Sequence, residues 1–132
     1  MARNDDTEIR TRGSYQRAFE AGATIFDEGE SGDKLYIIQS GEIELSRTAR
    51  GDQRVVARLG AGDFFGELGV VLGQPCINRA VAVCNTRVLE LDRETLQAMC
   101  LGEPEIAIRM IRVLVSRLIE AERRLAVLGV DD

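Results

Sequence analysis

Seven short apolar runs between residues 15 and 91 constrain the fold more than any other feature of the sequence. They are rich in Ile, Val, Phe and Tyr, are separated by glycine and acidic residues, and cover residues 16–19, 24–26, 35–39, 42–47, 54–58, 79–84 and 87–91. Short β-rich runs with turn residues at such intervals are typical of an antiparallel β sandwich or barrel. We therefore expect a mainly β domain over this part of the chain.

Local patterns within these runs predict how they pack. In residues 42–45 the glutamates alternate with Ile43 and Leu45, which predicts that the apolar side chains point inward and the glutamates outward. Ser40 and Gly41 separate two consecutive runs and predict a hairpin turn. The apolar run 70–72 is expected to lie in the core.

A glycine-spaced turn within residues 60–82 is the strongest candidate for a binding site. It presents five consecutive residues, which are Phe65, Gly66, Glu67, Leu68 and Gly69. A strand, a glycine turn and a short helix can offer unpaired backbone N–H groups to an anion. A phosphate repels a carboxylate, so Glu67 is better suited to accept a hydrogen bond from a hydroxyl group.

These motifs together resemble those of the cyclic nucleotide-binding domain family. The run Phe65-Gly66-Glu67-Leu68, followed by Pro75, is similar to the family's phosphate-binding cassette, and residues 25–30, 35–43 and 59–65 resemble its other motifs in order and spacing. The resemblance implies an antiparallel, jelly-roll-like β-roll barrel with a short cassette helix, then a short helix and a long C-terminal helix. It also implies a regulatory domain that binds cAMP or cGMP as its effector and moves the C-terminal helices.

The resemblance also implies which residues bind the ligand. They are Phe65, Gly66, Glu67, Leu68, Gly69, Cys76 and Ile77. Backbone amides at 66, 68 and 69 would contact the phosphate, and the carboxylate at 67 would accept from the ribose 2′-OH. The family usually carries an arginine at position 76, which pairs with the cyclic phosphate. A thiol is a weak neutral donor, so we expect affinity to fall roughly 10- to 100-fold.

Arg79 is the candidate replacement for the missing charge. Strand alternation places positions 76 and 78 on one face and 79 on the other, so Arg79 reaches the phosphate only if a bulge or longer loop shifts the register. Two hypotheses remain open. One is a sensor that binds cAMP or cGMP weakly; the other is a nucleotide-independent dimerisation or interaction module with a degenerate pocket or a different effector.

The apolar period becomes helical after residue 91. Asp92 is the expected N-cap of a short helix that ends at Gly102, and Pro104 begins a long helix to residue 128. The long helix carries a heptad seam that begins at Ala107 and predicts a parallel two-helix homodimer, with a single helix packed on the β domain as the alternative. The predicted dimer interface consists of Ile111, Leu114, Leu118, Ala121, Leu125 and Leu128.

Composition excludes several classes of function. The net charge of −5 argues against a nucleic-acid partner, and no apolar run approaches the roughly 18 residues that a membrane span needs. Three cysteines without a C-x-x-C pair indicate reduced thiols in a cytoplasmic protein. The chain has no histidine, which removes the commonest general base and zinc ligand. We therefore expect no enzyme activity, no catalytic residues, no metal and no cofactor.

The predicted organisation has three parts. Residues 1–14 are a flexible lead-in, residues 15–103 the β-roll, and residues 104–132 the long helix that acts as lid and dimer contact. Catabolite-activator-like members of the family continue into a helix-turn-helix domain. Because the sequence stops at Asp132, we do not expect the activity of a transcription factor.

Overall fold

The computed structural model describes residues 10–11 and 14–129, which divide into two compact units, one up to Leu96 and one from Gln97 onward. Most of the predicted flexible lead-in lies outside the described residues. Its described part is strand: Arg10–Thr11 form β1, which pairs with the next strand, β2, from Ser14 onward.

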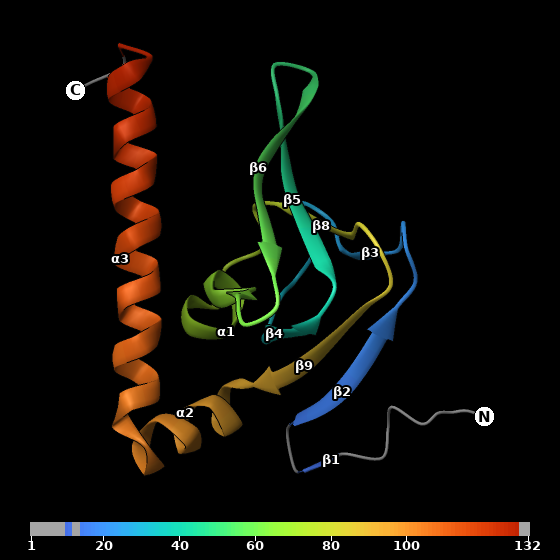
Figure 1. The fold of residues 1–132 in the computed structure, drawn as a ribbon, viewed down its shortest axis with the longest axis vertical. Coiled ribbons are helices and arrows are strands. Elements are labelled where there is room, and N and C mark those ends of the chain that lie inside the picture. The colour runs from blue at the N-terminus through green and yellow to red at the C-terminus, as the bar shows by residue number, and fades with distance from the viewer. Residues whose placement is uncertain (1–9, 12–13, 130–132) are drawn as a thin grey trace. The chain divides into compact units, whose positions relative to one another are not determined.

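Within residues 10–11 and 14–129, nine strands form two sheets with antiparallel neighbours, whose arrangement Figure 1 shows. The first sheet has the order β1-β2-β9-β4-β7, where β2 is Ser14–Phe19, β4 Lys34–Ser40, β7 Phe64–Phe65 and β9 Thr86–Asp92. The second has the order β3-β8-β5-β6, where β3 is Thr24–Phe26, β5 Glu42–Ala49, β6 Asp52–Gly60 and β8 Arg79–Ala82. All seven predicted runs are strands, and the mainly antiparallel β fold with helices is confirmed.

The hairpin predicted at Ser40 and Gly41 is wrong. Strand β4 pairs with β7 and β9, whereas β5 pairs with β6 and β8, so the chain changes sheet at this point. Gly41 has a φ of 101°, and a Cβ there would clash with Thr86. The Thr86 hydroxyl also accepts a hydrogen bond from the backbone N–H of Glu42 at 3.1 Å. A glycine is therefore required where the chain crosses from one sheet to the other. In the sequence, the same Ser-Gly pair is typical of a hairpin turn.

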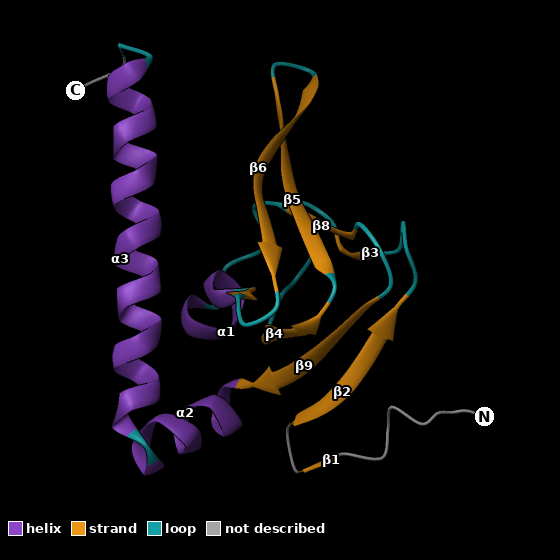
Figure 2. Cartoon of the chain, viewed as in Figure 1, coloured by secondary structure: helices purple, strands orange, loops and turns teal. Residues whose placement is uncertain are grey.

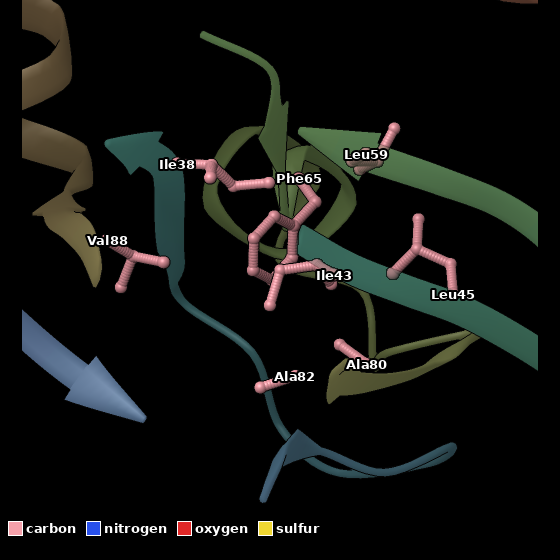
Figure 3. Close-up of a cluster of buried hydrophobic side chains, with 8 residues drawn as sticks. All are labelled: Ile38, Ile43, Leu45, Leu59, Phe65, Ala80, Ala82 and Val88. Atoms are coloured by element: carbon pink, nitrogen blue, oxygen red, sulfur yellow. The ribbon is translucent and has the colours of Figure 1, made fainter. Parts of the chain in front are cut away.

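A compact apolar core lies between the two sheets. Figure 3 shows eight of its side chains, from both sheets, which are Ile38, Ile43, Leu45, Leu59, Phe65, Ala80, Ala82 and Val88. Ile43 and Leu45 are buried as their alternation predicts, while Glu42 and Glu44 form ion pairs with Arg58 at 3.5 and 2.9 Å. The core holds the strands that carry the candidate site.

The first helix, α1 (Glu67–Leu72), follows the glycine turn directly. Val70 is fully buried, but Val71 and Leu72 are 58% and 64% exposed, so the prediction that all three lie in the core is wrong for the last two. A helix turns once every 3.6 residues or so, and a helix of six residues therefore gives the core only one face.

Two more helices follow the β strands (Figure 2), α2 at Arg93–Gly102 and α3 at Pro104–Val127. The side chain of Asp92 accepts a hydrogen bond from the Thr95 N–H at 2.8 Å, which confirms it as the N-cap of α2. Pro104 begins α3 as predicted. Within the described ranges, no helix is both long and apolar enough to cross a membrane.

Candidate functional site

A pocket of about 230 Å³ lies beside α1 and between the two sheets. It is lined by residues from β3, β4, β5, β7 and α1, and by the two loops at 30–33 and 76–78. All seven residues predicted to bind ligand line it: Phe65, Gly66, Glu67, Leu68, Gly69, Cys76 and Ile77. The structure thus brings the predicted residues to one place, and their contact with a ligand stays a prediction.

Two glycines allow the cassette turn to approach the neighbouring backbone. Gly66 caps α1 with a φ of 88°, and a Cβ at this position would lie 2.6 Å from the Lys34 carbonyl oxygen. A Cβ at Gly69 would clash with the carbonyl of Gly32. A larger residue at either position would therefore push α1 away from the backbone of residues 32–34.

Cys76 is fixed in the wall of the pocket by its own backbone. Its carbonyl accepts from the Gly29 N–H at 2.7 Å, and its N–H donates to the Glu30 carbonyl at 2.9 Å. The Sγ atom lies 3.0 Å from the Cβ position that a larger residue would have at Gly32. Burial, and secondarily the Glu30 carboxylate, raise the pKa of the Cys76 thiol. Position 76 is therefore neutral at physiological pH.

Three aromatic rings form an apolar wall at the pocket. Tyr36 stacks on Phe65 with ring centroids 5.0 Å apart, and Phe26 lies 5.9 Å from Tyr36 and 5.8 Å from Phe65. Both Phe26 and Tyr36 line the pocket, although neither was predicted to belong to the site. Their strands were predicted, but the side chains that face the cavity follow from how the sheets pair.

Glu90, on strand β9, is paired with Tyr36 on the neighbouring strand β4. It is only 3% exposed, and it lies directly opposite Tyr36 on β4 and Tyr15 on β2. Arg17 Nη1 lies 3.5 Å from its Oε2 atom. Burial, followed by the charge of Glu90, raises the pKa of Tyr36, so the Tyr36 hydroxyl remains protonated.

Carboxylates outnumber cations in the pocket lining. The lining contains Glu30, Asp33 and Glu67, and Lys34 is its one basic residue in the part of the chain that the structure describes. Lys34 Nζ lies 3.1 Å from Asp33 Oδ1, and this hydrogen bond raises the pKa of Lys34. Lys34 thus forms a surface ion pair with its neighbour Asp33, whose side chain is 82% exposed.

Neither Arg79 nor Arg47 lines the pocket. Arg79, proposed from the sequence as a replacement, is absent from the lining, and its Nη2 lies 3.4 Å from Thr24 Oγ1. Arg47, which the sequence analysis did not single out, donates from Nε to the Ile77 carbonyl at 3.2 Å. The Arg47 guanidinium is thus bonded to the backbone of segment 76–78 and does not line the pocket.

Five of the six residues predicted to form a dimer interface lie on α3, and the sixth, Leu128, is its C-cap; α3 has no buried residue among those described. Ile111, Leu118, Leu125 and Leu128 are 54%, 58%, 48% and 73% exposed, Ala121 is exposed and Leu114 is half-buried. Ile108, Val115 and Ile119 are also 47–48% exposed. The apolar surface of α3 is therefore wider than the predicted heptad seam.

Comparisons with known proteins agree with this architecture. The sequence matches the family model described as cyclic nucleotide-binding domain over residues 16–103. A CRP-like cAMP-activated global transcriptional regulator of Mycobacterium tuberculosis is 37% identical over 82% of this chain and 49% of that protein. A cAMP-dependent protein kinase regulatory subunit of Yarrowia lipolytica is 33% identical, over 66% of this chain and 25% of that protein. The catabolite activator protein of Thermus thermophilus superposes with a TM-score of 0.79 at 36% identity, covering 86% of this chain and 54% of that one. The chain thus spans about half the length of these CRP-like and catabolite activator relatives.

Proposed function

Because the chain belongs to the cyclic nucleotide-binding domain family, we propose that it is a regulatory module that binds cAMP or cGMP in the pocket beside α1 and moves its C-terminal helices on binding. The observation that carries the proposal is the shared location of the seven cassette residues in one pocket. The three free cysteines suit a reducing compartment, so we place the module in the cytoplasm.

The proposed roles follow the chemistry of the pocket. Glu67 accepts a hydrogen bond from the ribose 2′-OH, and the aromatic rings of Phe26 and Tyr36 provide apolar contact. The neutral thiol of Cys76 cannot pair with the cyclic phosphate. Because a hydrogen bond to a charged group contributes about 1.5–3 kcal/mol, we expect binding roughly 10- to 100-fold weaker than in a relative with arginine there.

Calorimetric titration with cAMP and cGMP tests the proposal. We expect wild-type protein to bind weakly and Cys76→Arg to bind about 10- to 100-fold more tightly, because the variant restores the countercharge. Cys84→Arg is the matched control, since Cys84 is exposed and lies outside the pocket lining. The absence of binding in both wild type and Cys76→Arg, with folding intact, would refute a cyclic-nucleotide site in this chain.

A second candidate is a nucleotide-independent dimerisation or interaction module. It is favoured by the exposed apolar stripe of α3, which includes Ile111, Leu118 and Leu125. Burial of such a stripe in a second copy of the helix would stabilise a homodimer whether or not the pocket is occupied. The two candidates differ in whether oligomeric state depends on ligand, which sedimentation with and without cAMP measures directly.

A further inference from the structure

Arg47 lies on the face of β5 that borders the pocket. Ile43 and Leu45 on this strand point into the core (Figure 3), and Leu45 also lines the pocket. Side chains alternate between the two faces of a strand, so residue 47 shares the face of residue 45. The irregular pairing of β5 with β6 leaves its extra residue, Val56, on β6, so the alternation along β5 is not interrupted.

A hydrogen bond joins the Arg47 guanidinium to the segment that contains position 76. Arg47 Nε donates to the Ile77 carbonyl oxygen at 3.2 Å, and all three residues of segment 76–78 line the pocket. Consecutive Cα atoms are about 3.8 Å apart, so the guanidinium is bonded one residue away from the position that usually carries the family's phosphate-pairing arginine. The Arg47 side chain is exposed, which leaves it room to change its rotamer.

The charge of Arg47 has no carboxylate partner. Within residues 10–11 and 14–129, Arg47 forms no ion pair, and its printed hydrogen bond goes to a neutral carbonyl. Arg54 lies directly opposite on β6, and like charges in that arrangement are destabilising. The carboxylate of Glu28 accepts hydrogen bonds from the N–H and the hydroxyl of Thr48, at 3.0 and 2.9 Å. An anion beside Arg47 would therefore offset the repulsion between the two arginines.

Arg79, the replacement proposed from the sequence, lacks these features. Ala80 and Ala82 on β8 are buried in the core, so alternation turns residue 79 to the opposite face. The pairing of β8 with β5 contains no register shift that would bring it back. Arg79 Nη2 lies 3.4 Å from Thr24 Oγ1, and its Nε is buried. Arg47 is therefore the better placed of the two arginines.

We infer that Arg47 supplies the countercharge to the cyclic phosphate that Cys76 cannot supply. The phosphate lies between the backbone N–H groups of the glycine turn and segment 76–78, and the Arg47 side chain turns from the Ile77 carbonyl to donate to the phosphate oxygens. Solvent screens this exposed charge, so it replaces an arginine at position 76 only in part. The inference deepens the proposed function, on which it rests, because it concerns the same pocket.

Calorimetric titration of Arg47→Gln with cAMP tests the inference. Glutamine removes the charge but keeps an N–H donor for the Ile77 carbonyl. We expect the affinity for cAMP to fall about 10-fold, because a charged hydrogen bond to the phosphate is lost. Arg54→Gln is the matched control, since it removes the same charge from the exposed arginine directly opposite. It should change the affinity less than about 3-fold, because solvent and salt screen a charge that does not contact the ligand.

A neutral ligand separates the charge of Arg47 from its contact with the backbone. The 3′,5′-cyclic methyl phosphotriester of adenosine keeps the rings of cAMP but not its charge, so Arg47→Gln should leave its affinity unchanged. Equal losses for cAMP and the triester would show that Arg47 only holds segment 76–78 in place. Urea unfolding verifies that each variant is folded before its affinities are compared.

A double-mutant cycle with Cys76→Arg provides a second measurement. Both arginines would serve the same anion, so their effects should not be additive. We expect Arg47→Gln to weaken cAMP binding less in the Cys76→Arg protein than in the wild type. Additive effects would mean that the two positions do not share the phosphate, and would contradict the inference.

The outcomes separate this inference from the proposed function. If the wild type binds cAMP and Arg47→Gln has no more effect than Arg54→Gln, the inference is overturned and the cyclic-nucleotide module stands. Binding of cAMP by Cys76→Arg but not by the wild type also overturns it, because Arg47 then provides no working countercharge. If neither protein binds cAMP although both are folded, the proposed function fails and the inference fails with it.

Discussion

Gly66 allows α1 to begin in close contact with the backbone at Lys34. Its backbone lies in the left-handed region at φ 88°, and the space for a side chain is taken by the Lys34 carbonyl. Gly62 has a similar φ of 93° but nothing within 4 Å of a Cβ. The two glycines therefore separate the cost of backbone conformation from the cost of a steric clash.

We predict that Gly66→Ala destabilises the protein more than Gly62→Ala. Both should lose about 1–2 kcal/mol through the left-handed conformation, and Gly66→Ala a further 1–3 kcal/mol or so through the clash. Urea unfolding of the two variants measures the difference. Equal losses would mean that the backbone at Lys34, where β4 begins, shifts without cost and does not hold α1 in position.

Cys76 and Cys84 allow the reactivity of a half-buried thiol to be compared with that of an exposed one. Burial raises the pKa of the Cys76 thiol, whereas Cys84 is exposed. Since the thiolate is the reactive form, we predict that Cys84 is alkylated faster at neutral pH, and that the Cys76 rate keeps rising above the ordinary thiol pKa of about 8.5. Mass spectrometry of variants that retain one of the two thiols gives both rates. Matching pH profiles would refute the buried, protonated state of Cys76.

At the scale of elements, α2 depends on its cap. The pKa of Asp92 is lowered by hydrogen bonds from Thr95, so its contribution to stability is present above the unfolded carboxyl pKa and is lost as pH falls through the folded value. We predict that Asp92→Ala lowers the urea midpoint at pH 7, whereas Asp92→Asn, which keeps a capping acceptor, stays close to wild type. Asp92→Asn should also lose part of the acid sensitivity. Equal midpoints for the Ala and Asn variants would argue against a capping role.

The elements themselves were largely predictable from sequence, but their pairing was not. Alternation around Ile43 and Leu45 located both a strand and its buried face. The same local signal at Gly41 serves a hairpin or a change of sheet, and only the partners of β4 and β5 decide between them.

The cassette positions of the candidate site followed from motif spacing, whereas the aromatic wall did not. Phe26 and Tyr36 come from separate strands, and their meeting at the pocket depends on long-range packing that one sequence does not specify. The same holds for α1. A helix of six residues is too short for its apolar periodicity to show which face is buried, and Val71 and Leu72 are exposed.

At the scale of the whole molecule, the exposed apolar stripe of α3 predicts that a second copy of the chain covers it. A helix of 24 residues spans about 36 Å at roughly 1.5 Å per residue, and Ile111, Leu118 and Leu125 keep half or so of their surface exposed along it. An apolar stripe of this length is unfavourable in water. A second copy of the helix can bury it along a heptad seam, which is the arrangement predicted from the sequence.

We predict that Leu118→Glu shifts the protein from dimer to monomer, because each dimer would lose two buried leucines and gain two charges at the contact. Full burial of one leucine contributes about 1.5–3 kcal/mol, so the dissociation constant should rise at least about 100-fold. Ser116→Glu is the matched control, since Ser116 is an exposed polar residue on the same helix and the same charge is added. Sedimentation equilibrium measures the association, and circular dichroism verifies that α3 remains helical. A monomeric wild type, or equal effects of the two variants on association, would refute the predicted homodimer.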